Sequence, residues 1–204
     1  SAKNSSILNF NSQKKVWKIG ITICEDIWVE QSLQNEKILG KDPIESLEKE
    51  KLDLLINLSA SPFIQSKSLL RQRIAAKAAI RLSCPIIYVN QVGGNDELIF
   101  DGSSFTLDKK GKLRQELPAF KESIVICNMN SMKQQQIVSR TYPTSHEVLF
   151  RALVLGVKDY AKKCNFNSAI IGLSGGIDSA LVLTIAVAAL GISKVHAILM
   201  PSPW

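Results

Sequence analysis

The sequence lacks several patterns that would place it in familiar protein classes. It contains no run of eighteen apolar residues, so we expect no membrane-spanning helix and no membrane partner. Its four cysteines lie far apart and form no C-x-x-C pair, which argues against zinc and redox motifs and favours reduced thiols in the cytoplasm. Its two histidines, His146 and His196, have no ligand-spaced partner, and we expect structural roles for both.

The sequence also lacks an aromatic-rich basic strip, although its net charge is +7. Lysine and arginine are scattered along the chain, so the charge predicts no nucleic-acid partner, and anionic nucleotide substrates explain it at least as well. There is no initial methionine and no signal-peptide pattern, and the chain stops just after a predicted strand, so we expect both ends to be cut. At 204 residues and 46% hydrophobic content, the chain has enough material for one large or two small domains.

The most informative stretch reads Gly172, Leu173, Ser174, Gly175, Gly176, Ile177, Asp178, Ser179. It follows an apolar run at 169–171, predicted to be a buried strand, and opens into a predicted helix at 180–190. The paired glycines permit a sharp turn whose amides can face an anion, and the two serines add hydroxyl donors. A carboxylate beside a phosphate needs a bridging cation, so Asp178 indicates magnesium. An ordinary strand-to-helix turn is the alternative interpretation.

Two common phosphate-binding motifs are absent, because no Walker lysine follows the glycines and no G-x-G-x-x-G occurs. Instead, residues 174–179 resemble the SGGxDS signature of the PP-loop ATP pyrophosphatases. That resemblance implies that residues 172–179 bind ATP, that Asp178 binds Mg²⁺, and that AMP is transferred to a substrate. The signature alone leaves NAD, GMP and asparagine synthetases and tRNA-thiolating enzymes open.

The first half of the chain alternates predicted strands and helices, which indicates an α/β fold. Asp42, Pro43 and Glu45 form a helix start, and Arg73, Lys77 and Arg81 are assigned to the solvated side of a later helix. We expect strands at 16–23, 52–58, 85–90 and 123–128, short antiparallel strands at 97–100, 102–107 and 112–117, helices from 42 and from 66, and a turn at 91–96. Further along, we expect a helix that starts at Thr144 or Ser145 and a strand at 195–199 that completes a strand-helix-strand unit.

Cys24 stands where the first of these strands ends, a position that can project a thiol into a pocket. The competing interpretation is a small buried hydrophobic residue. Acidic residues follow it directly, so any group that activates the thiol must come from elsewhere in the fold.

Residues 23–28 match the nucleophile segment of glutaminases in the nitrilase family of carbon–nitrogen hydrolases. Residues 90–102 are similar to the NQVGG-x-DE-x-x-FDG stretch of the glutamine-dependent NAD synthetases. The resemblance implies the C-terminal part of a nitrilase-like αββα sandwich at 1–130, a linker at 131–144, and the start of a Rossmann-like PP-loop domain at 145–204.

The same resemblance implies a division of labour among the residues. Cys24 attacks glutamine and releases ammonia, Ser61 and Lys67 hold the glutamine, and Glu25 has a structural rather than a catalytic role. Ammonia then amidates nicotinic acid adenine dinucleotide after ATP forms an adenylate. We expect the glutamate and lysine of the nitrilase triad upstream of Ser1, most of the dinucleotide site beyond Trp204, and a homo-oligomer for the full-length protein.

Two other hypotheses remain open from the sequence. One is a nitrilase-type amidase joined to a different PP-loop adenylating domain. The other is that the chain, taken alone, is an inert fragment without turnover.

Overall fold

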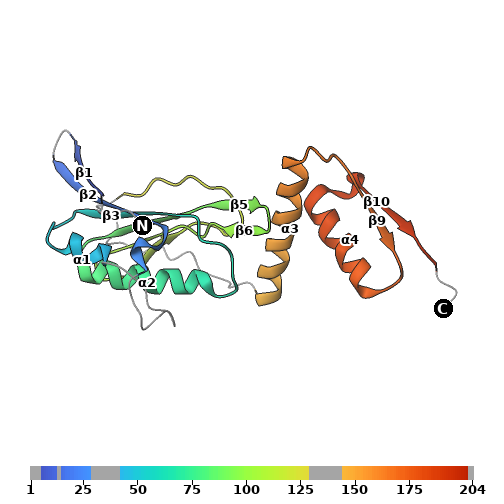
Figure 1. Cartoon of the computed structure of the whole chain (residues 1–204), viewed down its shortest axis with the longest axis horizontal. Helices are drawn as coiled ribbons and strands as arrows, with labels where there is room; N and C mark the ends of the chain where they lie inside the picture. The colour runs from blue at the N-terminus through green and yellow to red at the C-terminus, as the bar shows by residue number, and fades with distance from the viewer. Residues whose placement is uncertain (1–5, 13–14, 29–41, 129–143, 202–204) are drawn as a thin grey trace.

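The computed structural model describes residues 6–12, 15–28, 42–128 and 144–201, and these form two α/β units. In the first unit the described strands make a six-stranded sheet in the order β1-β2-β3-β4-β7-β8. In the second unit two parallel strands pack with helix α4, and helix α3 of this unit lies on the side that faces the first unit (Figure 1). The predicted α/β class is confirmed.

Three parallel strands form the centre of the larger sheet. Strands β2, β3 and β4 run parallel, while β1 pairs antiparallel with β2 and β7 antiparallel with β4. Their carboxyl ends therefore meet at one edge of the sheet. The bounds are β1 (Ser6–Asn11), β2 (Val16–Ile23), β3 (Leu54–Ser59), β4 (Ile86–Asn90), β7 (Phe105–Leu107) and β8 (Leu113–Glu116).

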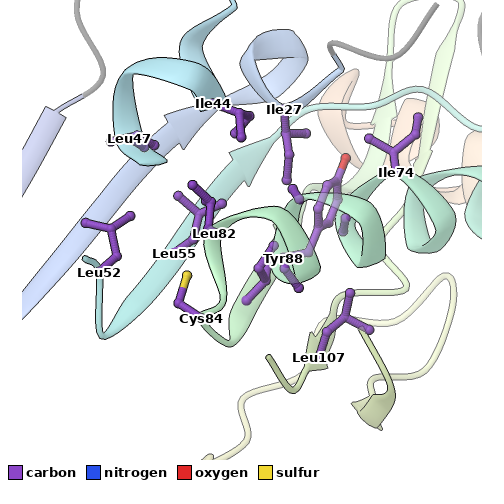
Figure 2. Close-up of a cluster of buried hydrophobic side chains, with 14 of the residues drawn as sticks. Ile27, Ile44, Leu47, Leu52, Leu55, Ile74, Leu82, Cys84, Tyr88 and Leu107 are labelled. Atoms are coloured by element: carbon purple, nitrogen blue, oxygen red, sulfur yellow. The ribbon is translucent and has the colours of Figure 1, made fainter. Parts of the chain in front are cut away.

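Helices α1 (Pro43–Glu48) and α2 (Lys67–Leu82) cover one face of this sheet. As predicted, Asp42 caps α1, and its carboxylate accepts hydrogen bonds from the backbone amides of Ile44 and Glu45 at 2.8 and 3.2 Å. The apolar side chains between helices and sheet form the core (Figure 2), which includes Ile27, Ile44, Leu47, Leu52, Leu55, Ile74, Leu82, Cys84, Ile86, Tyr88, Phe105 and Leu107. Arg73, Lys77 and Arg81 are exposed on α2, as expected.

The predicted turn at 91–96 is wrong in part, because residues 92–95 form a strand. Strand β5 (Val92–Asn95) pairs antiparallel with β6 (Leu98–Asp101) in a hairpin, and only the tip turns. The glycines that suggested a turn serve a close approach instead. A Cβ atom on Gly94 would lie 3.4 Å from the Cα atom of Gly156 in α3, which is van der Waals contact, so the hairpin backbone lies close against the helix.

The predicted strand at 123–128 is also wrong. Residues 123–128 carry no strand assignment, and the Ile124 and Ile126 side chains are almost fully exposed. Their β-branched side chains favour extended backbone, but a strand also needs a partner for its backbone hydrogen bonds. Sequence patterning cannot supply that partner.

The second unit contains α3 (Ser145–Lys163), β9 (Ala169–Leu173), α4 (Ile177–Leu190), the short 3₁₀ helix η3 (Ile192–Lys194) and β10 (Val195–Leu199). Strands β9 and β10 are parallel, so the predicted strand-helix-strand order is confirmed. The predicted burial of residues 169–171 is wrong, because the Ile170 side chain is exposed and Ala169 and Ile171 are only half-buried. Thr144 caps α3 as expected, and the predicted linker at 131–144 otherwise lies outside the described residues. Across the described ranges, no helix combines the length and apolarity needed to cross a membrane.

Candidate functional sites

Cys24 is the first residue of a short 3₁₀ helix, η1 (Cys24–Ile27), which follows β2 directly. Its φ of +50° lies in the left-handed region, which costs a non-glycine residue about 1–2 kcal/mol. Side chains hold the turn: Asp26 accepts a hydrogen bond from the Ile23 amide at 3.0 Å, and the Asn57 amide group donates to the Cys24 carbonyl at 3.4 Å. The Cys24 side chain is half-buried, so the thiol is not sealed in the core.

The strand register brings further polar groups to the same edge. Ile23 of β2 pairs with Leu58 of β3, so Ser59 lies beside Cys24 in the next strand. The Ser59 hydroxyl lies 4.0 Å from the Cys24 sulfur, and the Tyr88 hydroxyl donates to the Ser59 oxygen at 3.0 Å. Tyr88 therefore contacts Ser59, and Ser59 in turn contacts the Cys24 thiol.

Ser61 lies in the loop that follows β3, and the side chain of Asn90, the last residue of β4, binds both backbone groups of Ser61. The Ser61 amide donates to the Asn90 side-chain oxygen at 2.9 Å, and the Asn90 amide group donates to the Ser61 carbonyl at 3.3 Å. The Ser61 hydroxyl is buried and has no hydrogen-bond partner within the described part of the chain. A buried unpaired hydroxyl costs about 1–3 kcal/mol, which a polar ligand would offset.

A buried ion pair lies behind Ser61. The Arg71 guanidinium of α2 donates to both carboxylate oxygens of Asp101 at 2.9 and 2.5 Å, and the Arg71 side chain has no solvent exposure. The same guanidinium reaches the Ser61 carbonyl at 3.4 Å. The bidentate hydrogen bonds to Asp101 hold the guanidinium in one orientation, so that Arg71 supports the Ser61 loop more rigidly than a single contact would allow.

Lys67 begins α2, and its ammonium lies 5.6 Å from the centre of the Trp28 ring, which follows η1. The contact places the cation at the carboxyl edge of β2 and β3. The structure therefore brings Cys24, Ser61 and Lys67 to one end of the sheet. Glu25 is exposed.

The other cysteines lie in different surroundings. Burial raises the pKa of the Cys84 thiol to about 12, so Cys84 is an inert core residue at neutral pH. Burial also raises the pKa of Cys127, and Cys164 is exposed near the end of α3. His146 and His196 are exposed, and the described residues hold no cluster of three potential metal ligands.

The glycine stretch forms the predicted strand, turn and helix start. Strand β9 ends at Leu173, Gly175 has a φ of +89°, and α4 begins after Gly176. The Ser174 and Ser179 hydroxyls lie 3.3 Å apart across the turn, and Ser179 donates to the Gly176 carbonyl at 2.9 Å.

The turn is open to a ligand. Gly172, Ser174, Gly175, Gly176, Ile177 and Asp178 are exposed, whereas Leu173 and Ser179 are half-buried. Asp178 lies in the first turn of α4, where free amides carry partial positive charge. The turn belongs to the second unit, so the structure does not bring residues 172–179 together with Cys24.

With this geometry established, each unit can be compared with known protein families. The carbon-nitrogen hydrolase family profile matches residues 4–137, more than half of the chain. The chain belongs to the carbon–nitrogen hydrolase family. A second profile, NAD synthase, matches residues 149–204.

Curated relatives match the chain across both units. The glutamine-dependent NAD(+) synthetase of Synechocystis sp. is 46% identical over 191 residues, which cover 92% of this chain and 34% of that protein. The protein of the same name from Acinetobacter baylyi is 36% identical, and the match covers 90% of this chain and 32% of that protein. The chain thus spans about a third of the length of these relatives.

A solved structure supports the same relationship. Glutamine-dependent NAD+ synthetase from Acinetobacter baumannii, determined in complex with adenosine diphosphate, superposes with a TM-score of 0.81 at 34% identity. The match covers 98% of this chain and 36% of that chain. The glutamine-dependent NAD(+) synthetase from Cytophaga hutchinsonii is 21% identical and superposes with a TM-score of 0.64. This match covers 93% of this chain and 31% of that chain, and it shows that the two share a fold.

Sequence reasoning missed the residues that surround the predicted ones. Asn57, Ser59, Asn90 and Tyr88 form the polar edge, and Arg71 was overlooked among the basic residues of α2. One signal was available. Polar residues recur at every second position near the end of an apolar strand, as in Asn57 and Ser59, and that spacing places both on one face.

Proposed function

We propose that the chain is the central part of a glutamine-dependent NAD(+) synthetase, which amidates nicotinic acid adenine dinucleotide with ammonia from glutamine. The single observation that carries the proposal is the presence of two separate sites on one chain. One is a half-buried thiol on a strained turn, and the other is an open glycine turn at a helix start. The names of the relatives and both family profiles support it.

In the first site, Cys24 is the proposed nucleophile. Its sulfur attacks the carboxamide carbon of glutamine, the thiol proton leaves with the nitrogen as ammonia, and water hydrolyses the resulting thioester to glutamate and free thiol. The unpaired Ser61 hydroxyl and the Lys67 ammonium are the proposed glutamine contacts. Their placement at the edge occupied by Cys24 supports this assignment.

In the second site, residues 172–179 are the proposed ATP-binding residues. The carboxylate of the dinucleotide attacks the α-phosphate and expels pyrophosphate, and ammonia then displaces AMP. The exposed Ser174 hydroxyl and the amides of the turn suit phosphate oxygens.

Mg²⁺ is proposed to bind with ATP through Asp178. One exposed carboxylate fits this ion, because Mg²⁺ bound with a nucleotide takes one or two protein carboxylates plus phosphate oxygens and waters. When bound, the ion neutralises charge that develops on the phosphates.

We also propose the division into a glutaminase part at 1–130, a linker at 131–144 and a synthetase part at 145–204. Two statements about the full-length protein stay predictions: that it forms a homo-oligomer and that it is located in the cytoplasm.

The experiment is Cys24→Ala in the full-length protein, assayed for NAD formation with glutamine or with ammonium chloride. We expect glutamine-driven synthesis to fall at least a thousandfold, because the nucleophile is gone, while ammonium-driven synthesis stays within twofold of wild type. Cys164→Ala, which removes an exposed thiol elsewhere, is the matched control and should leave both rates unchanged.

Loss of both activities in Cys24→Ala, with the fold intact by circular dichroism, would contradict the two-site assignment. So would persistence of the glutamine-driven rate. Replacing nicotinic acid adenine dinucleotide with other carboxylic acids in an ATP/pyrophosphate exchange assay tests the substrate separately, because only the true acid stimulates exchange.

A further inference from the structure

Ser59 and Tyr88 form a chain of hydroxyl groups that leads to the Cys24 sulfur, and neither has a part in the proposed contacts to glutamine. Tyr88 is fully buried, and its ring stacks on Phe105 at 4.8 Å between centroids. Its hydroxyl donates to the Ser59 oxygen at 3.0 Å, which leaves the Ser59 proton free for another acceptor. Within the described residues, Ser59 is the one side chain in hydrogen-bond reach of the sulfur, at 4.0 Å.

The register of three strands produces this line of groups. Ser59 ends β3 and pairs with Asn90 of β4, while Cys24 directly follows β2. Because side chains alternate along a strand, Tyr88 and Asn90 share one face of β4. The register of β2, β3 and β4 therefore brings Cys24, Ser59 and Tyr88 to the same edge of the sheet.

We propose that Ser59 is a catalytic residue that donates a hydrogen bond to the Cys24 thiolate, and that Tyr88 is a positioning residue that orients the Ser59 proton. A neutral thiol is a weak acceptor, so a 4.0 Å separation is expected before ionisation. An anionic sulfur attracts the proton more strongly, and charge-assisted hydrogen bonds are shorter. The donor chain polarises along its length, which strengthens the final bond.

Other charged groups lie on the elements around Cys24. Glu25 and Asp26 share η1 with it, and Asp26 is engaged by the Ile23 amide. Lys67 and Arg71 come from α2, where Lys67 lies over Trp28 and Arg71 is held by Asp101. Burial raises the pKa of Tyr88, so its hydroxyl remains a neutral donor at pH 7.

The inference rests on the proposed role of Cys24 as nucleophile, and its test avoids glutamine altogether. Iodoacetamide reacts with the thiolate, so its rate against pH reports ionisation at Cys24. The rate is measured in the full-length protein from pH 5 to 10 by mass spectrometry of the peptide that contains Cys24. Wild type is compared with Ser59→Ala, Ser59→Thr, Tyr88→Phe and the Ser59→Ala/Tyr88→Phe double variant. Ser83→Ala, an exposed serine after α2, is the matched control.

We expect Ser59→Ala to move the pH midpoint of alkylation upward by about one unit and to slow alkylation at pH 7 about tenfold, since a hydrogen bond to a charged group is lost. Ser59→Thr keeps the hydroxyl and should stay within about twofold of wild type. Tyr88→Phe keeps the stacked ring and should slow alkylation about two- to threefold. Added to Ser59→Ala, it should have no further effect, because it acts through Ser59.

An unchanged midpoint in Ser59→Ala would overturn the inference, and so would a Ser59→Thr variant as slow as Ser59→Ala. A Tyr88→Phe effect of equal size with and without Ser59 would remove the positioning role. If Tyr88→Phe does not fold, the Ser59→Ala and Ser59→Thr pair decides the catalytic role. Should Cys24→Ala retain glutamine hydrolysis, the proposed function fails, yet the alkylation profiles still report whether Ser59 stabilises the thiolate.

Discussion

The polar residues around Cys24 divide into those that hold the backbone and those that face the thiol. Asn57 and Asn90 bind backbone groups of Cys24 and Ser61, respectively, and both are buried. Buried amides of this kind fix loop geometry, because each lost partner leaves an unsatisfied group. Ser59 instead presents its hydroxyl to the sulfur.

Arg71 carries the charge with the greatest structural consequence among these residues. We predict that Arg71→Met destabilises the protein by about 3–5 kcal/mol, because it leaves the Asp101 carboxylate buried and unpaired. Urea denaturation at pH 7, followed by circular dichroism, measures the loss. The variant should also raise the KM for glutamine, because the Ser61 loop loses one of its supports.

The double variant Arg71→Met/Asp101→Leu separates charge burial from packing. Removing both partners should restore most of the stability, since apolar replacements of a buried ion pair are often neutral. An Arg71→Met protein as stable as wild type would contradict the ion-pair assignment. Arg73→Met, an exposed arginine two positions along the same helix, is the control.

At the scale of elements, the turn between β7 and β8 depends on one carboxylate. Asp108 accepts hydrogen bonds from the Lys110 and Lys112 amides at 2.8 and 2.9 Å and from the Arg114 guanidinium at 3.0 Å. Burial acts to raise the pKa of Asp108, but the Lys112 amide, Arg114 and the Lys110 amide together lower it below its ordinary value of 3.8.

This lowered pKa predicts a pH dependence. The carboxylate stabilises the folded state fully above pH 3.8, and this contribution is lost as the pH falls through the folded-state pKa. We predict that Asp108→Asn destabilises the protein by about 1–2 kcal/mol at pH 7 and by less at pH 2, because protonation of Asp108 at low pH weakens its charge-assisted hydrogen bonds in the wild-type protein. Urea midpoints at pH 7 and at pH 2 measure the loss of stability at each pH, and equal losses would contradict the prediction.

At the scale of the whole molecule, α3 joins the two units through backbone contacts with the β5–β6 hairpin. Asp159 accepts a hydrogen bond from the Gly94 amide at 2.8 Å, and the Lys163 ammonium donates to the Gly94 carbonyl at 2.6 Å and to the Asn95 side chain at 3.1 Å. The hairpin continues into Asp101, the partner of Arg71. The contact thus connects α3 with the Ser61 loop.

We predict that Asp159→Ala loosens this contact without unfolding either unit. The Gly94 amide loses its acceptor, so its hydrogen exchange should accelerate at least tenfold, measured by mass spectrometry of the peptide that spans β5. Lys162→Ala, an exposed neighbour on α3, should leave the exchange unchanged. Unchanged exchange in Asp159→Ala would show that the close glycine packing alone holds the helix.

The sequence by itself determined most of the helices and strands and both family motifs. Apolar runs located the central strands, Asp42 and Thr144 marked helix starts, and residues 172–179 specified a strand, a turn and a helix start. These features are local, because each depends on residues within a few positions of one another. Cys24, Ser61 and Lys67 came from the family resemblance, and the structure brings them to one edge.

Only the tertiary structure decided which distant side chains meet. The Gly93–Gly94 pair suggested a turn, yet it allows Gly94 to approach Gly156 more than sixty positions away in the chain. The 123–128 run had the composition of a strand but joins no sheet in the part of the chain that the structure describes. The Arg71–Asp101 pair and the line from Tyr88 through Ser59 to Cys24 depend on strand register and helix placement, which long-range packing fixes and local sequence patterns do not encode.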